Sequence, residues 1–206
     1  MISDSIPWRV ELARIASRLE RKSRQESWSE RSTFRTEKDL MLVGYAIRRL
    51  TEARKLADSL VAAQVPVLRF PRVGVIPDVY NKEDIDKHYA LDAPVQSQIK
   101  LGHFCNQLIH SYIFMHSFED IIEPVEQEDG TILDGVRYFN GVFVASEHER
   151  YKHVYFFPLD AITALCRKVA AEDIVGVDMR RDKDGLMQIS HVISSADEEV
   201  RLIEGH

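Results

Sequence analysis

Apolar residues recur at steps of three and four in two N-terminal stretches, residues 8–26 and 37–63. This spacing places them on one face of a helix, so both stretches are predicted to be helical. The polar stretch 27–36 between them predicts a loop or a frayed turn. The apolar positions are Trp8, Leu12, Ile15 and Leu19 in the first stretch, and Leu40, Val43, Ile47, Leu50, Ala57 and Leu60 in the second.

Two prolines, Pro66 and Pro71, end the helical pattern, and residues 64–90 are predicted to be a long connection with Val-rich extended pieces. Asp92 is a candidate cap for a third helix, which the apolar pattern carries to about Phe118.

After Pro124 the apolar period changes from 3.6 to 2, which predicts strands. A short helix over residues 160–170 and a hairpin over 174–189, with a turn at Asp184-Gly185, complete the chain. The predicted fold class is α+β. A helical bundle over residues 1–123 forms the core, and residues 124–206 add a small antiparallel sheet with one or two helices. The strand positions are Val136, Tyr138, Val142, Val144, Val154, Tyr155 and Phe156.

Charge is distributed unevenly over the 206 residues, which carry a net charge of −6. Residues 1–60 hold 13 Lys and Arg against 9 Asp and Glu, and the remainder holds 14 against 24. This balance argues against a nucleic-acid binder that uses its whole surface. It leaves open a local basic surface at the N-terminal end, or a helix face of mixed charge that faces only solvent.

Several functional classes lack their sequence signature. The longest purely hydrophobic run is four residues, and no signal-peptide pattern precedes the first helix, so a cytoplasmic protein without a membrane partner is expected. The two cysteines cannot form a four-cysteine zinc site. Without a glycine-rich phosphate loop or a nucleophile elbow, no cofactor is expected.

The clearest chemical lead is the polar side of the predicted third helix. His103, Asn106, Gln107 and His110 share this side with Phe114, and no Lys or Glu lies between Lys100 and Glu119. One interpretation is a solvated face. A metal site is disfavoured, because His103 and His110 are two turns apart, about 10.5 Å.

A third interpretation is a catalytic or ligand-binding stripe. Asn106 and His110 are four residues apart and therefore adjacent on a helix. Histidine can accept or donate a proton near neutral pH, and this suits transfer at an RNA phosphodiester. Arg48 or Arg49 can supply a cation if the two long helices pack side by side; the alternative is a solvated pair close to Glu52.

The segment Cys105-Asn106-Gln107-Leu108-Ile109-His110 resembles the signature of HEPN proteins, helical proteins that include many nucleases of bacterial toxin and phage-defence systems. That signature is an Arg, a polar residue that is often Asn, three residues and a His. The resemblance places His110 on the His and Asn106 on the polar residue. Cys105 stands where the family has its Arg and cannot stabilise phosphate charge. The resemblance covers at most residues 8–118 and implies a helical core.

Two functions follow from this reading. The first is a non-enzymatic interaction or regulatory module in a bacterial defence or toxin–antitoxin setting, with RNA or a protein as partner. Phe114 on an uncharged polar face is typical of an interface core. The alternative is a metal-independent endoribonuclease with His110 as general acid and base and Asn106 orienting it or contacting phosphate. The candidate binding residues are His103, Gln107, Phe114, Arg48 and Arg49.

A homodimer is expected on two grounds. HEPN proteins commonly dimerise with two motifs facing one cleft, and the resemblance implies the same here. Independently, an uncharged polar stripe that carries Phe114 can be buried against its symmetry mate without leaving an unpaired charge. Residues 103–117 are therefore expected to lie near the two-fold axis.

Overall fold

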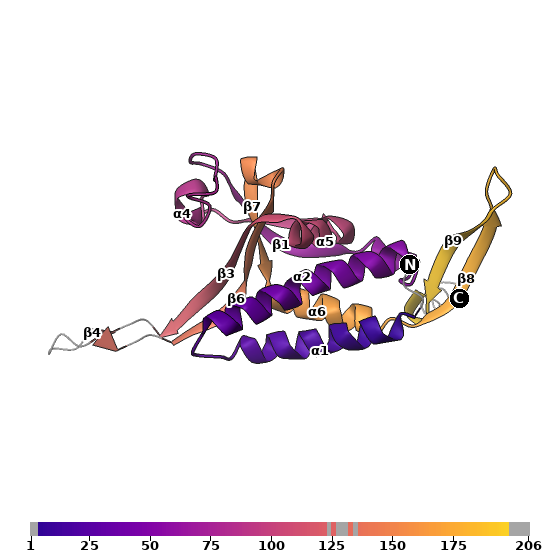
Figure 1. The fold of residues 1–206 in the computed structure, drawn as a ribbon, viewed down its shortest axis with the longest axis horizontal. Helices are drawn as coiled ribbons and strands as arrows, with labels where there is room; N and C mark the ends of the chain where they lie inside the picture. The colour runs from indigo at the N-terminus through magenta and orange to yellow at the C-terminus, as the bar shows by residue number, and fades with distance from the viewer. Residues whose placement is uncertain (1–3, 123–124, 127–131, 134–135, 198–206) are drawn as a thin grey trace, which may run out of the picture.

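A five-stranded antiparallel sheet with strand order β2-β1-β7-β6-β3 organises the computed structural model (Figure 1). The structure describes residues 4–122, 125–126, 132–133 and 136–197. The strands of the sheet are β1 (Gln64–Pro71), β2 (Val95–Lys100), β3 (Ser111–Ile122), β6 (Val136–Ser146) and β7 (His153–Pro158).

One face of the sheet and four helices bury a common apolar core. Side chains alternate along each strand, so Val142 and Val144 of β6 contact the helices while Ala145 points to the opposite face. The helices are α1 (Ile6–Lys22), α2 (Glu30–Glu52), α5 (Leu101–Ile109) and α6 (Leu159–Ala170).

A second, smaller cluster covers the opposite face of the sheet. Phe70, Ile113 and Val154 pack there against Ile85 and Tyr89, which belong to the segment around α4 (Ile85–His88). In Figure 1, α4 and α1 accordingly lie on opposite sides of the sheet.

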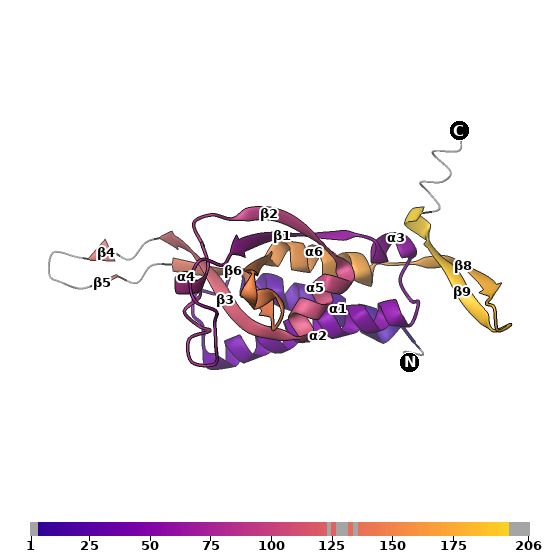
Figure 2. The same cartoon turned by 90° about the horizontal axis from the view of Figure 1, so that it is seen from above.

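The remaining elements are short or project from the ends. The hairpin of β8 (Ile174–Arg181) and β9 (Met187–Ser194) extends from one end of the molecule, and β4 (Val125–Glu126) and β5 (Ile132–Leu133) lie at the other (Figure 2). Helix α3 (Asp58–Val61) and the 3₁₀ helix η1 (Glu149–Tyr151) lie within connections.

The predicted arrangement of an N-terminal helical bundle followed by a small sheet is wrong, although the chain is a mixture of α and β structure. Helices occur along the whole chain, and the five-stranded sheet dominates its C-terminal part. Strands from both sides of position 124 join the same sheet. Pro124, the expected break, lies outside the described residues.

The prolines of β1 kept its residues from being predicted as a strand, because proline argues against a central strand. The structure accommodates Pro66 because β7 pairs with β1 only from Leu68 onward, so Pro66 has β2 alone as a neighbour. Residues 64–71 are therefore a strand within the segment that had been predicted to be a connection.

The predicted helix over residues 92–118 is also wrong. The helix α5 spans only Leu101–Ile109, between β2 and β3. Both faces of β3 carry apolar side chains, with Ile113 buried on one side and Phe114 packed on the other. A strand that is apolar on both faces cannot be distinguished from a buried helix by periodicity alone.

Other elements are confirmed with shifted ends. Helix α2 starts earlier than predicted, because the Ser29 side chain caps it by accepting from the Ser32 N–H. It also ends earlier, at Glu52, and Arg54 then adopts a φ of 55°. Helices α1 and α6, strands β6 and β7, and the β8–β9 hairpin with Gly185 at φ 81° all occur where the pattern predicted them.

No helix in the described residues is both long enough and apolar enough to cross a membrane.

Candidate functional site: a cleft between α2 and α5

Helices α2 and α5 approach each other closely at Gly44. A Cβ atom at this position would lie 3.0 Å from the Leu108 Cβ and 3.2 Å from the Cys105 carbonyl oxygen. Glycine costs about 1 kcal/mol relative to alanine inside a helix. Here it lets the two backbones come together, and Arg48, one turn further along α2, is carried toward α5.

Arg48 joins the two residues that the sequence motif had singled out. Its Nη1 donates to Asn106 Oδ1 at 3.2 Å and lies 3.5 Å from His110 Nε2. Its Nε donates to Glu52 Oε1 at 3.0 Å. A guanidinium only donates, so Nε2 is the acceptor in the contact with His110, which leaves the ring proton on Nδ1.

The helix α5 is fixed to the sheet by a second group of polar side chains. Gln107 is 2% exposed, and its Oε1 accepts from the Ser146 N–H at 2.8 Å. Gln107 Nε2 and Tyr155 Oη each lie 3.3 Å from His103 Nε2. Burial raises the pKa of Tyr155, so its phenol keeps the proton that it can donate to His103.

The opposite wall of the cleft comes from the connection between β6 and β7. Glu147 Oε1 pairs with Arg150 Nη2 at 2.5 Å, and Glu149 Oε2 lies 3.1 Å from His153 Nε2. Burial lowers the pKa of His153 to about 4, so that ring is neutral near pH 7. The cleft has a volume of about 550 Å³ and is lined by Arg48, His103, Asn106, Gln107, His110, Ser146, Glu147, His148 and Glu149.

The structure thus brings together five of the seven candidate residues, and it meets the condition set for Arg48, because α2 and α5 pack side by side. Arg49 does not line the cleft and pairs with Glu52 Oε2 at 2.5 Å. Phe114 lies on β3 rather than on the helix and packs against the main core. The predicted single polar helix face over residues 103–117 is therefore wrong.

Two parts of the site had little or no signal in the sequence. None of the seven candidate residues lies in the segment 146–149. Only the sheet order, which places β6 beside β3 and hence close to the end of α5, brings this segment to the cleft. Gly44 had no distinguishing neighbour in the sequence.

Cys105, which stands where the HEPN signature has Arg, is 1% exposed. Burial raises the pKa of its thiol to about 12, so it stays protonated near neutral pH and acts as a small apolar side chain. Arg48 instead supplies the cation beside His110, from another helix.

The described residues contain no group of three or more His, Cys, Asp or Glu side chains placed to hold one metal ion. The chain matches no family model, no curated protein and no solved structure. The resemblance to HEPN proteins therefore rests on the short motif alone, and the chemistry of the cleft has to follow from its own residues.

Proposed function

We propose that the cleft between α2 and α5 cleaves RNA, as a metal-independent endoribonuclease. The observation that carries this proposal is the position of Arg48 Nη1, 3.2 Å from Asn106 Oδ1 and 3.5 Å from His110 Nε2. A proton acceptor and a guanidinium thus stand side by side in an open cleft. Glu52 pairs with both Arg48 and Arg49, so these three side chains keep one net positive charge. Cleavage of a phosphodiester by an internal nucleophile needs both a proton acceptor and a positive charge.

RNA suits these groups because its 2′-hydroxyl is the nucleophile. His110 Nε2 takes the hydroxyl proton as the 2′-oxygen bonds to phosphorus. The bond from phosphorus to the 5′-oxygen then breaks, and that oxygen receives a proton from His110 or from His148 on the opposite wall. The products are a 2′,3′-cyclic phosphate and a 5′-hydroxyl.

Arg48 has a separate role in this scheme. A substrate phosphate replaces His110 as the acceptor of its Nη1, which frees the Nε2 lone pair for the 2′-hydroxyl. The guanidinium then stabilises the negative charge that grows on the non-bridging oxygens. Asn106 holds the guanidinium in position through Oδ1, which makes it a positioning residue.

The interaction-module alternative has less support. It depended on Phe114 within an uncharged helix face, whereas Phe114 lies on β3, partly buried against the main core, and the cleft carries Arg48, Glu147 and Glu149. The homodimer around residues 103–117 and the bacterial defence setting stay predictions of the sequence. Light scattering on the purified chain tests the dimer, and a monomer would contradict it.

The proposed function is tested with a labelled single-stranded RNA in excess EDTA. The wild type should cleave it, and His110→Ala should lower the rate by about 10²–10⁴, the usual contribution of general acid–base catalysis. His191→Ala is the matched control, because the His191 side chain is 66% exposed on β9 and lies outside the cleft. Absence of cleavage by the wild type, or equal rates for wild type and His110→Ala, would refute the proposal.

A further inference from the structure

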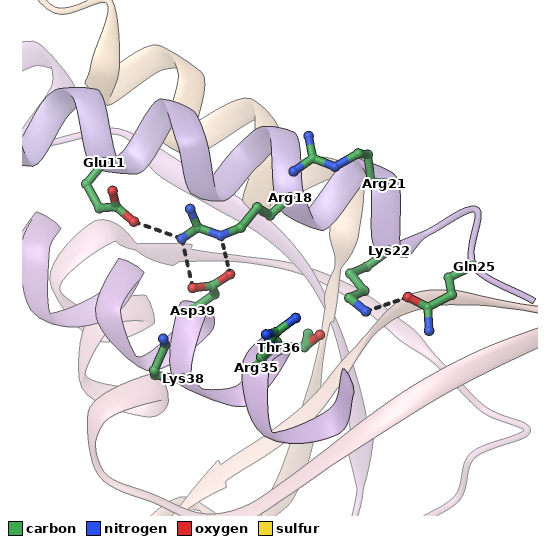
Figure 3. A pocket seen from close by; sticks show the side chains of 9 residues that line it. All are labelled: Glu11, Arg18, Arg21, Lys22, Gln25, Arg35, Thr36, Lys38 and Asp39. Carbon is green, nitrogen blue, oxygen red and sulfur yellow. Dashed lines mark hydrogen bonds and ion pairs between the residues drawn. The ribbon is translucent and has the colours of Figure 1, made fainter. Parts of the chain in front are cut away.

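A second pocket lies on the other side of α2, between α2 and α1 (Figure 3). Arg35 on its wall and Arg48 in the cleft are thirteen residues apart, which places them about 220° apart around the helix. The pocket has a volume of about 540 Å³ and is lined by Glu11, Arg18, Arg21, Lys22, Gln25, Arg35, Thr36, Lys38 and Asp39.

Positive charge dominates this pocket, with five cations and two carboxylates among the lining residues. Arg18 is neutralised: it donates to both oxygens of Asp39 at 2.8 and 2.9 Å and to Glu11 at 2.8 Å. Figure 3 shows these three side chains meeting between the two helices. Both carboxylates therefore bind Arg18, and the excess positive charge of the pocket lies on the other four cations.

Those four cations lack anionic partners within the part of the chain that the structure describes. Arg21, Arg35 and Lys38 form no ion pair there, and Lys22 is hydrogen-bonded only to the neutral Gln25 and Ser32 side chains. Burial and the nearby charge of Arg35 lower the pKa of Lys22. The repulsion among such closely spaced positive charges falls when an anion binds between them.

Thr36 gives a second and independent indication of a ligand. It is 1% exposed, it lines the pocket, and its Oγ1 has no hydrogen-bond partner among the described residues. A buried hydroxyl without a partner is unfavourable, and most buried polar groups in proteins are hydrogen-bonded. A ligand oxygen in the pocket would accept its proton.

We propose that the pocket between α1 and α2 binds a compact phosphate anion with at least two phosphoryl groups, such as pyrophosphate or the polyphosphate end of a nucleotide. Arg21, Lys22, Arg35 and Lys38 neutralise its charge, and the Thr36 hydroxyl donates to one of its oxygens. The surplus of positive charge exceeds what one phosphoryl group would balance. A terminal phosphoryl group offers three oxygens to a recessed donor, whereas a phosphodiester within an RNA chain offers only two. This proposal does not depend on the proposed ribonuclease activity.

Isothermal titration calorimetry on the full chain tests the site, with pyrophosphate, ATP and adenosine as probes. Saturable binding of pyrophosphate at one site per chain is expected, and adenosine should not bind. Tighter binding of ATP than of pyrophosphate would identify the nucleotide as the ligand, and equal affinities would identify the free anion. Arg35→Ala should weaken pyrophosphate binding at least tenfold. Arg49→Ala is the matched control, because it removes the same charge from α2 about 21 Å away along the helix, and it should change the affinity less than twofold.

Thr36→Val separates a ligand contact from a structural role. It removes the hydroxyl and keeps the branched shape, so it should raise the melting temperature of the ligand-free protein while weakening pyrophosphate binding several-fold. The proposal is overturned if pyrophosphate shows no saturable binding, if Thr36→Val leaves the affinity unchanged, or if Arg49→Ala matches the loss of Arg35→Ala. It is also overturned if a 12-nucleotide RNA binds His110→Ala more tightly than pyrophosphate does and the further substitution Arg35→Ala abolishes that RNA binding.

Discussion

The cleft and the pocket on the two sides of α2 have nearly equal volumes, about 550 and 540 Å³, but opposite chemistry. Three histidines and one arginine line the cleft, whereas five arginines and lysines and no histidine line the pocket. Histidine changes its charge near neutral pH, and arginine does not. One helix therefore presents groups suited to proton transfer on one side and groups suited to holding an anion on the other.

The two sites also differ in how their walls are held together. At the cleft, Gly44 lets the backbones of α2 and α5 touch, which fixes Arg48 against Asn106 and His110. At the pocket, the long side chain of Arg18 spans the gap to Asp39. The backbone contact fixes the positions of the cleft residues, whereas the side-chain bridge leaves a pocket of about 540 Å³ between α1 and α2.

Among the variants that compare the two sites, Arg48→Ala should have the largest effect, on RNA cleavage. Loss of the cation that stabilises the developing phosphate charge should lower the rate by about 10²–10³. Pyrophosphate binding should stay unchanged, since the pocket lies on the other side of α2. Arg49→Ala, which removes the neighbouring charge that does not line the cleft, should retain most of the activity. Equal losses for the two variants would mean that only the total charge of this surface matters.

Gly44→Val tests the backbone contact that builds the cleft. The new Cβ would lie 3.0 Å from the Leu108 Cβ, and its methyl groups would push α2 away from α5. The free energy of unfolding should fall by about 1–3 kcal/mol, as for other overpacked cores. Cleavage should fall as well, because Arg48 moves away from His110. Urea denaturation measures the stability.

Gly102→Ala is the control for that prediction. A Cβ at Gly102 meets nothing within 4 Å, so alanine should raise the stability of α5 by up to about 1 kcal/mol. A Gly44→Val variant as stable and as active as the wild type would show that the close approach is not required.

Acid should destabilise the fold through the buried His153 and the half-buried His116. Burial lowers the pKa of His116 and of His153 to about 4, against about 6.5 in an unfolded chain. Both rings are neutral in the folded state, so the unfolded state takes up more protons below pH 6.5. The free energy of unfolding should be highest above about pH 7 and should fall by about 3–4 kcal/mol between pH 7 and pH 5, since each ring contributes nearly half of the loss.

His116→Phe sharpens this prediction, because His116 packs among aromatic rings and its Nε2 has no hydrogen-bond partner among the described residues. The variant should remove about half of the pH dependence, while His191→Phe, at an exposed site, should leave it unchanged. Of the two histidines, His153 lies next to the cleft, because its ring contacts Glu149. No histidine lines the pocket between α1 and α2. If the free energy of unfolding of His116→Phe depended on pH as strongly as that of the wild type, the lowered pKa given to His116 would be contradicted.

The smallest expected effect belongs to Asp39→Asn in the pocket. The variant weakens the pair between Arg18, whose side chain is 36% exposed, and Asp39, whose side chain is 8% exposed, so the loss of stability should be about 1–2 kcal/mol. Because one negative charge leaves the pocket, pyrophosphate should bind a few-fold more tightly, as calorimetry would measure. Weaker binding in Asp39→Asn would show that Arg18 must be held by Asp39 for the pocket to work.

Sequence patterns predicted the side chains that line the cleft better than they predicted the fold around the cleft. Asn106 and His110 were recognised because four-residue spacing makes helical neighbours whatever the fold. Arg48 was a candidate residue only on the condition that two helices pack together. Gly44 permits that packing because it is small, but a single glycine adds nothing to a periodic apolar pattern.

The sheet was missed where long-range pairing overrides the local pattern. The first half of β1 alternates, with Val65 and Val67 buried, but its prolines argue against a central strand. The strand β3 is apolar on both faces and so lacks the alternation of a half-buried strand. The opposite wall of the cleft, residues 146–149, depends on β6 pairing with β3, and a single sequence does not encode such pairing locally. The excess of basic residues before position 60 left open a local basic surface but indicated no pocket, and the buried hydroxyl of Thr36 could be recognised only in the structure.

Replacement of a single 2′-hydroxyl tests the ribonuclease assignment most directly. The position at which the wild type cuts a short RNA in EDTA is mapped first, and the same oligonucleotide is then made with deoxyribose at that one nucleotide. Cleavage there should disappear, and the products of the all-ribose oligonucleotide should end in a 2′,3′-cyclic phosphate and a 5′-hydroxyl. Continued cleavage at the deoxyribose position, or products that carry a 5′-phosphate, would contradict attack by the 2′-oxygen and with it the role proposed for His110.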